Sequence, residues 1–246
     1  MKNGGSFITA DTGVMKTIVS ETSQFSFGGE SACSFGALSL ARLVLEHKSG
    51  VTVPLFTSAL TTATEHFSLY TQGITSMHCN AFEVLTSEFG PIFYPDLQVI
   101  TFSDPEPLEL IELLSKDKIV FPHVFLPLGD ITIQPALLPE IAQLLIALDR
   151  LCCATVCVTM GYAFGICALG EEKFAVFDSH SKELKETSER GSYIAVIAGV
   201  AEAARFICEC TLDSRQAILE SIDPSDVAQI EAVTSLQLCL LRLKSF

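Results

Sequence analysis

The sequence predicts one α+β domain in which helices come first and a mainly antiparallel sheet follows. Apolar residues recur at helical spacing early in the chain, and short apolar runs joined by tight turns recur in its second half. We find no internal repeat, low-complexity tract or linker, so residues 1–246 are assigned to a single domain. A composition that is 49% hydrophobic and 18% charged can bury a substantial core and argues against disorder.

Two helices are predicted after a polar, Gly- and Ser-rich start. Residues 1–20 are expected to be flexible. Ser31 is the predicted N-cap of the first helix, and Gly50 is its stop signal. Between them, apolar residues recur at helical spacing at Ala37, Leu40, Ala41, Val44 and Leu45. A second helix is predicted over residues 56–72.

The stretch between residues 80 and 130 is broken into short pieces by prolines. We expect a β-like run at residues 97–102 and a helix near residues 108–114. A further helix is predicted over residues 137–148.

An antiparallel meander is predicted after that helix. Apolar runs at residues 153–159, 162–169 and 173–179 alternate with a period of two and are joined by short connections. Residues 193–198 are the predicted fourth strand, and a helix follows through residues 201–208.

Residues 151–170 carry no charge and are long enough to span a bilayer as a helix. The β-branched Val156 and Val158, and the interruption at Gly161, favour two short strands instead. A membrane-anchored protein that uses this segment stays an alternative, and the solubility of the purified chain without detergent would test it.

The charge balance limits the class of partner. With 29 acidic and 15 basic residues, the formal net charge is -14. Such a surface repels phosphate backbones, so no nucleic acid is expected as a partner, whereas a basic macromolecule would be attracted.

The cysteine pattern indicates a reducing compartment inside the cell. Nine cysteines at irregular spacing do not form a disulfide framework, and residues 1–16 contain no apolar signal-peptide core. Cys208-x-Cys210 has no second pair at zinc spacing, so we expect no metal, and no organic cofactor is expected either.

Cys33 is the candidate nucleophile. If Ser31 caps the helix, Cys33 lies in its first turn, where unpaired backbone N–H groups and the helix dipole favour a thiolate. The alternative is a small apolar residue packed at the start of a helix, because buried cysteines are usually inert.

A candidate base and its orienting carboxylate lie where the strand at residues 173–179 ends. Residues i and i+2 of a strand share a face, so Asp178 and His180 project side by side while Ser179 points away. The carboxylate could hold the imidazole in one tautomer and stabilise its charged form, as a Cys–His pair requires. An acidic turn with a solvated His180 is the alternative.

Gln24 precedes Cys33 in a polar segment. Its side-chain amide could donate to an oxyanion together with the backbone N–H of Cys33. Taken alone, a solvated loop glutamine explains Gln24 equally simply.

Together these segments resemble the N-terminal protease of herpesvirus large tegument proteins. The resemblance is carried by Gln24, by Gly28-Gly29-Glu30-Ser31-Ala32-Cys33-Ser34 and by Phe177-Asp178-Ser179-His180. Gly161-Tyr162-Ala163-Phe164 before that strand is also similar. Members often have proline where this chain has Ser179, and cellular and transposon-borne relatives share the signature.

The resemblance implies a papain-like fold in which the Cys33 helix packs on the C-terminal sheet. It implies a deubiquitinase with Cys33 as nucleophile and His180 as base. Asp178 would orient His180, and Gln24 would donate to the oxyanion. Such proteins cleave after the C-terminal glycine of ubiquitin, and some also remove the ubiquitin-like NEDD8. The implied protein is a monomer in the cytoplasm or nucleus of a host cell, and in the virion tegument if the chain is viral.

Two other classes of function stay open. One is an adaptor that binds ubiquitin without cleaving it, and the other is a papain-fold transferase or glutamine deamidase. Residues 240–246 give no clear natural end, which is compatible with an excised domain of a larger polypeptide.

Overall fold

The computed structural model describes residues 14–27, 31–72, 79–100, 124–125, 130–133, 138–159, 162–183, 190–208, 222–223, 225–226 and 236–244. Its helices are α1 (Cys33–His47), α2 (Val53–Tyr70), α3 (Ala81–Thr86), α4 (Gly90–Phe93), α6 (Leu138–Leu151) and α7 (Val200–Phe206), with the short 3₁₀ helices η1 (Gln24–Phe27) and η2 (Lys48–Gly50). Its strands are β1 (Val14–Ser20), β2 (Leu97–Val99), β3 (Val124–Phe125), β4 (Asp130–Ile133), β5 (Ala154–Thr159), β6 (Tyr162–Gly170), β7 (Lys173–Glu183), β8 (Arg190–Ala198) and β9 (Leu236–Leu243). The helix expected near residues 108–114 lies outside the described residues.

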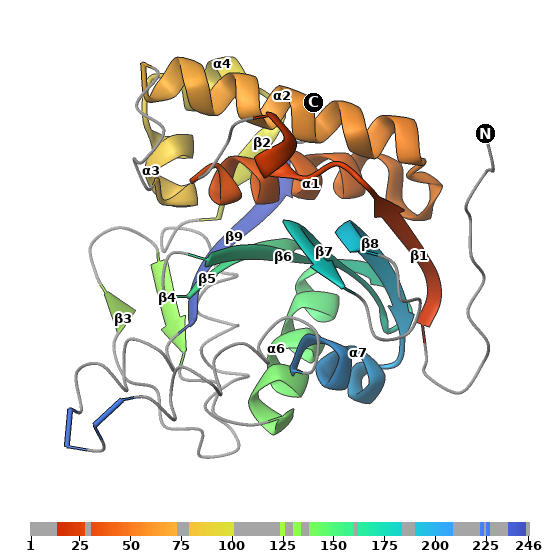
Figure 1. Cartoon of the computed structure of the whole chain (residues 1–246). Coiled ribbons are helices and arrows are strands. Elements are labelled where there is room, and N and C mark those ends of the chain that lie inside the picture. The colour runs from red at the N-terminus through yellow and green to blue at the C-terminus, as the bar shows by residue number, and fades with distance from the viewer. Residues whose placement is uncertain are drawn as a thin grey trace.

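These elements form three layers with the sheet in the middle (Figure 1). Helices α1 and α2 lie on one face of the sheet, and α6 and α7 lie on the other. The described strand pairs are antiparallel, in the order β1-β8-β7-β6-β5-β9-β4-β3. Leu241 of β9 pairs with Ala154 of β5 and with Val99 of β2, so β2 adds to the edge of β9 that faces away from β5.

The alternation of side chains along the strands divides the interior into two cores. In β7, Ala175 and Phe177 belong to the core under α1, whereas Phe174 and Val176 belong to the core over α6 and α7. Both faces of the sheet are therefore covered. The central strands are therefore apolar at nearly every position, as strands buried on two faces are, and do not show the predicted alternation with a period of two.

Helix α1 is buried between the sheet and α2, and its outer side is fixed by a tyrosine. The hydroxyl of Tyr94 donates to the backbone oxygen of Phe35 at 3.2 Å and hydrogen-bonds Ser39 Oγ at 3.3 Å. Further along the helix, the Arg42 guanidinium binds the Asp96 carboxylate. These contacts join the first ten residues of α1 to the segment between α4 and β2.

The predicted packing of an N-terminal helix on a C-terminal antiparallel sheet is confirmed. The helix predicted over residues 56–72 is α2, and the three apolar runs of the meander are β5, β6 and β7, followed by β8. The uncharged segment at residues 151–170 contributes the pair β5–β6, which runs from Ala154↔Cys167 to Thr159↔Tyr162. No helix among the described residues is both long and apolar enough to span a membrane.

Two N-terminal predictions are wrong. Ser31 is not the N-cap, because Ala32 occupies that position and no side chain caps α1. Residues 14–20 were expected to be flexible but form β1 along the edge of β8. Val14 is buried in the core over α6 and α7, and Ile18 is buried in the core under α1, which accounts for this strand. The polar residues before and after the strand make it hard to recognise in the sequence.

Candidate active site

Cys33 is the first residue of α1, and it is 5% exposed. Its predicted place in the first helical turn is confirmed. The backbone N–H of Gly36 donates the first hydrogen bond of the helix, to Ala32 O at 2.8 Å. The backbone N–H groups of the residues before Gly36 have no acceptor within the helix, as at every helix N-terminus. The Cys33 thiol therefore lies at the positive end of the helix dipole.

The side chains of Asp178 and His180 lie side by side at the end of β7, as their spacing predicts. His180 Nδ1 is 2.8 Å from Asp178 Oδ1, and the backbone N–H of His180 donates to the same oxygen at 2.8 Å. Asp178 is fully buried, whereas the His180 side chain is 16% exposed. The carboxylate thus fixes both the backbone and the ring of the histidine.

His180 also hydrogen-bonds the side chain of Cys33. Because Nδ1 is used by Asp178, Nε2 is the ring nitrogen left for the sulfur. Burial alone would lower the pKa of His180, but the hydrogen bonds to Asp178 and Cys33, with their negative charges, raise the pKa to about 9. The imidazolium form of His180 is therefore favoured at neutral pH.

Tyr162, the first residue of β6, completes the surroundings of this pair. Its hydroxyl donates to Asp178 Oδ2, and its ring stacks on the His180 ring with centroids 4.4 Å apart. Burial, followed by the charge of Asp178, raises the pKa of Tyr162 far above its ordinary value. Tyr162 therefore stays a neutral donor at physiological pH.

Gln24 is not a solvated loop residue, since it opens η1 and is only 2% exposed. Its Oε1 accepts a hydrogen bond from Ser179 Oγ at 2.8 Å. Its Nε2 is buried and has no hydrogen-bond partner among the described residues. Ser179 does point away from the Asp178–His180 pair, as alternation predicts, but it points toward the glutamine.

The backbone before η1 is held against the edge of the sheet. Ser192 Oγ, on β8, donates to Thr22 O at 2.5 Å, and the Ser20 hydroxyl contacts Thr57 Oγ1 of α2 at 3.2 Å. The turn that follows is closed by Ser26, whose backbone N–H donates to Ser23 O at 3.0 Å. These bonds fix the position of η1 beside β7 and α2, which it contacts.

All four residues proposed from the sequence are therefore brought together, and only the contact between Gln24 and Ser179 was not predicted. His180 hydrogen-bonds both Cys33 and Asp178, and Gln24 accepts a hydrogen bond from Ser179 of the same strand, β7. Phe25 of η1 also contacts the His180 ring, with centroids 5.8 Å apart, and is 49% exposed. The residues that sequence reasoning missed are Tyr162, Ser179 and Phe25.

The predicted hairpin of residues 162–169 and 173–179 gives only a partial signal for Tyr162, because its register comes from the structure. The pairing Gly165↔Phe177 in the β6–β7 hairpin, continued toward the ends of both strands, brings Tyr162 opposite His180. No comparable signal exists for Ser179, because its contact with Gln24 depends on how η1 docks on β7.

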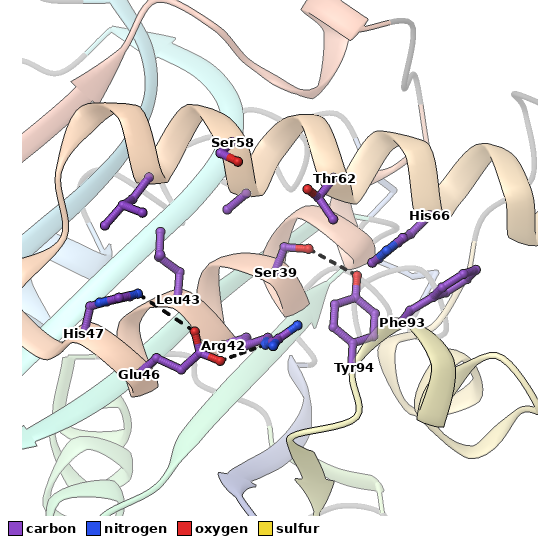
Figure 2. A pocket seen from close by; sticks show the side chains of 12 residues that line it. Ser39, Arg42, Leu43, Glu46, His47, Ser58, Thr62, His66, Phe93 and Tyr94 are labelled. Atoms are coloured by element: carbon purple, nitrogen blue, oxygen red, sulfur yellow. Dashed lines mark hydrogen bonds and ion pairs between the residues drawn. The ribbon is translucent and has the colours of Figure 1, made fainter.

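A cavity of about 210 Å³ lies between α1 and α2 (Figure 2). Ser39 of α1, Thr62 and His66 of α2, and Tyr94 line it. The His66 ring stacks on Phe93 with centroids 4.3 Å apart and meets the Tyr94 ring edge-on at 5.4 Å. Burial lowers the pKa of His66, so this imidazole is neutral at pH 7. None of the four candidate residues lines this cavity, which is therefore separate from the Cys33 site.

The described residues contain no group of three His, Cys, Asp or Glu side chains that could hold a metal ion. Cys210 lies outside the described residues. Cys79 is another thiol of the core under α1. Burial, then the charges of Glu83 and Cys33, raises the pKa of Cys79 to about 11, so Cys79 stays protonated at neutral pH.

Comparison with known proteins gives a structural likeness only. Neither family models nor curated protein sequences match the chain. Among solved structures, the fold is similar to the ubiquitin-specific protease encoded by murine cytomegalovirus tegument protein M48, which was solved in complex with a ubiquitin-based suicide substrate. The TM-score is 0.46 at 11% sequence identity, over 94% of this chain and 88% of that one.

Proposed function

We propose that this protein is a cysteine-type deubiquitinase that hydrolyses the bond after the C-terminal glycine of ubiquitin. The observation that carries the proposal is the buried hydrogen-bonded series Cys33–His180–Asp178 at the start of α1. A thiol, an imidazole and a carboxylate in that order are the components of nucleophilic acyl transfer.

In the proposed reaction, the Cys33 sulfur attacks the carbonyl carbon of the glycine. The developing oxyanion accepts hydrogen bonds from Gln24 Nε2 and the backbone N–H of Cys33. The His180 imidazolium gives its proton to the departing lysine amine, which leaves a thioester on Cys33. Water then attacks the thioester, His180 takes its proton, and ubiquitin is released with a free carboxylate while the sulfur is regenerated.

Ubiquitin is proposed as the substrate because of the motif resemblance and the charge of the chain. The order Gln24, Cys33, Asp178-x-His180 resembles that of the herpesvirus tegument deubiquitinases. A formal net charge of -14 favours a partner whose recognition face is rich in arginine and lysine, as that of ubiquitin is. NEDD8, being ubiquitin-like, is the second substrate to test.

The test is reaction of the purified protein with ubiquitin that carries an electrophile at its C-terminus. We expect a covalent adduct at Cys33 in the wild type and none in Cys33→Ala. Cys152→Ser is the matched control, since Cys152 is an exposed thiol and its loss should leave the adduct unchanged. An adduct that persists in Cys33→Ala would contradict the assignment.

Fluorogenic ubiquitin and NEDD8 conjugates separate hydrolysis from the other functions. Binding of ubiquitin without adduct or turnover would indicate an adaptor. Mass spectrometry of the released ubiquitin distinguishes a hydrolase, which leaves a carboxylate, from a transferase, which leaves a new amide. A deamidase would instead convert a glutamine of its target to glutamate.

A further inference from the structure

We propose that Ser179 is a positioning residue that holds the Gln24 carboxamide with its Nε2 end free for the oxyanion. This inference rests on the proposed function and adds a residue to it. Ser179 lies between Asp178 and His180 in sequence, but its hydroxyl bonds Gln24 instead of the Asp178–His180 pair, so it acts on a different part of the site.

The contact that carries the inference joins two buried side chains that are 155 residues apart in sequence. Ser179 is 0% exposed, and its Oγ donates to Gln24 Oε1 at 2.8 Å. A carboxamide accepts at one end and donates at the other. Because the acceptor end is occupied by Ser179, the donor end is the one left without a partner among the described residues.

The orientation of the carboxamide decides whether Gln24 helps or hinders catalysis. With Nε2 free, the group offers an N–H to a developing negative charge. Rotated by half a turn, it would present Oε1, whose partial negative charge repels an oxyanion. The Ser179 hydroxyl stabilises the first orientation because it fills the Oε1 site.

Helix α1 confines this pair from its other side. A Cβ built on Gly36 would lie 2.6 Å from both Cβ and Oγ of Ser179, and 3.8 Å from Gln24 Oε1. The glycine therefore allows α1 to approach β7 closely enough to leave Ser179 little freedom to turn away from Gln24. The same helix carries Cys33, so the nucleophile and the carboxamide are placed by one packed unit.

A donor that acts on the oxyanion works mainly in the transition state, so its misorientation should lower kcat and leave KM nearly unchanged. A neutral hydrogen bond contributes roughly 1 kcal/mol net, which corresponds to about a fivefold change in rate. Removal of the donor itself costs on the order of a hundredfold. We therefore expect Ser179→Ala to lower kcat about fivefold to tenfold, and Gln24→Ala to lower it roughly a hundredfold.

The deciding experiment is a double-mutant cycle on a fluorogenic ubiquitin conjugate. Ser179→Ala should lower kcat in the wild-type background and have no further effect in the Gln24→Ala background, because its role passes through the glutamine. Ser39→Ala removes a buried hydroxyl of α1 that bonds Tyr94, and it should leave kcat unchanged in both backgrounds. An equal loss from Ser179→Ala in both backgrounds, or no loss in either, would overturn the proposal.

A second measurement tests the contact without any activity. In protein labelled with ¹⁵N-glutamine, Ser179→Ala should shift the Gln24 side-chain amide signals, whereas Ser39→Ala should not. Unshifted Gln24 signals would overturn the proposal even in an active enzyme. A wild type that neither hydrolyses ubiquitin nor forms an adduct would overturn the proposed function, and the amide signals would still decide whether Ser179 holds Gln24.

Discussion

Tyr162 stacks on the His180 ring at 4.4 Å and at the same time donates its hydroxyl to the carboxylate that holds this ring. The Tyr162 side chain therefore contacts both the imidazole and the Asp178 carboxylate that is its counter-ion. A donor to a carboxylate withdraws part of the negative charge that would otherwise stabilise the imidazolium. Tyr162 is thus placed to set how strongly His180 keeps its proton.

Tyr162→Phe should raise the pKa of His180 further, because the Asp178 carboxylate then serves the imidazolium alone. In the pH profile of kcat/KM, the alkaline limb reports loss of the imidazolium proton, so it should move to higher pH. Tyr94→Phe, which removes a buried tyrosine hydroxyl that bonds Phe35 O and Ser39 instead of the Asp178–His180 pair, is the control and should not move this limb. A limb that moves to lower pH would show that Tyr162 supports the imidazolium instead.

The folded-state pKa of His180, about 9, also predicts a pH dependence of stability. Because this pKa lies above the unfolded value near 6.5, the folded state holds the proton more tightly. The stabilisation is fully present below pH ~6.5 and is lost as the pH rises through about 9. Urea denaturation should show the free energy of unfolding falling across this window in the wild type, with a smaller fall in His180→Ala.

Substitutions of the pair should separate catalysis from stability. His180→Ala should reduce turnover nearly as much as Cys33→Ala, since members of a catalytic unit do not act additively. Asp178→Ala should reduce turnover less, because the carboxylate only orients and polarises. Asp178→Ala should lower the free energy of unfolding more than His180→Ala does, by about 3 kcal/mol or more. The reason is that donors of His180 and Tyr162 lose a buried charged acceptor. A folded Asp178→Ala slower than His180→Ala would reverse the roles.

Gly36→Ala should destabilise the protein although alanine favours helices over glycine by about 1 kcal/mol. The added methyl would lie 2.6 Å from Ser179, so α1 or β7 must shift, at a cost of roughly 1–3 kcal/mol. Thermal unfolding should show a lower Tm, and kcat should fall as Ser179 moves. Gly50→Ala is the matched control, because a Cβ there meets no atom within 4 Å. A Gly36→Ala protein with raised Tm would contradict the packing of Ser179 against α1.

The main elements of the fold could be predicted because their signals are local. Helical spacing of apolar residues identified α1 and α2, and short apolar runs with tight turns identified β5, β6 and β7. Strand β1 was missed because Lys16 and Thr17 interrupt its apolar residues, and Val14 and Ile18 gain their burial only when the strand pairs with β8. Pairing between distant segments leaves no periodic trace in a single sequence.

The candidate site was predictable only where neighbours in sequence are neighbours in space. The spacing of Asp178 and His180 on one strand was enough to place them together. The β6–β7 register that brings Tyr162 to His180 depends on an irregularity between Ala168 and Gly170, and a slip of one residue reverses the faces of a strand. The meeting of Ser179 with Gln24 requires the complete tertiary structure.

The position of β9 has a consequence for folding during synthesis. This strand, Leu236–Leu243, pairs with β5 on one side and with β4 and β2 on the other. It therefore joins these two parts of the sheet, although it is synthesised after all three strands. Until it has left the ribosome, β5 presents an unpaired apolar edge, which is a template for aggregation. Strands β5 to β8 and both candidate site segments are already made by then, so the nascent chain must hold a nearly complete site on a sheet that is still open.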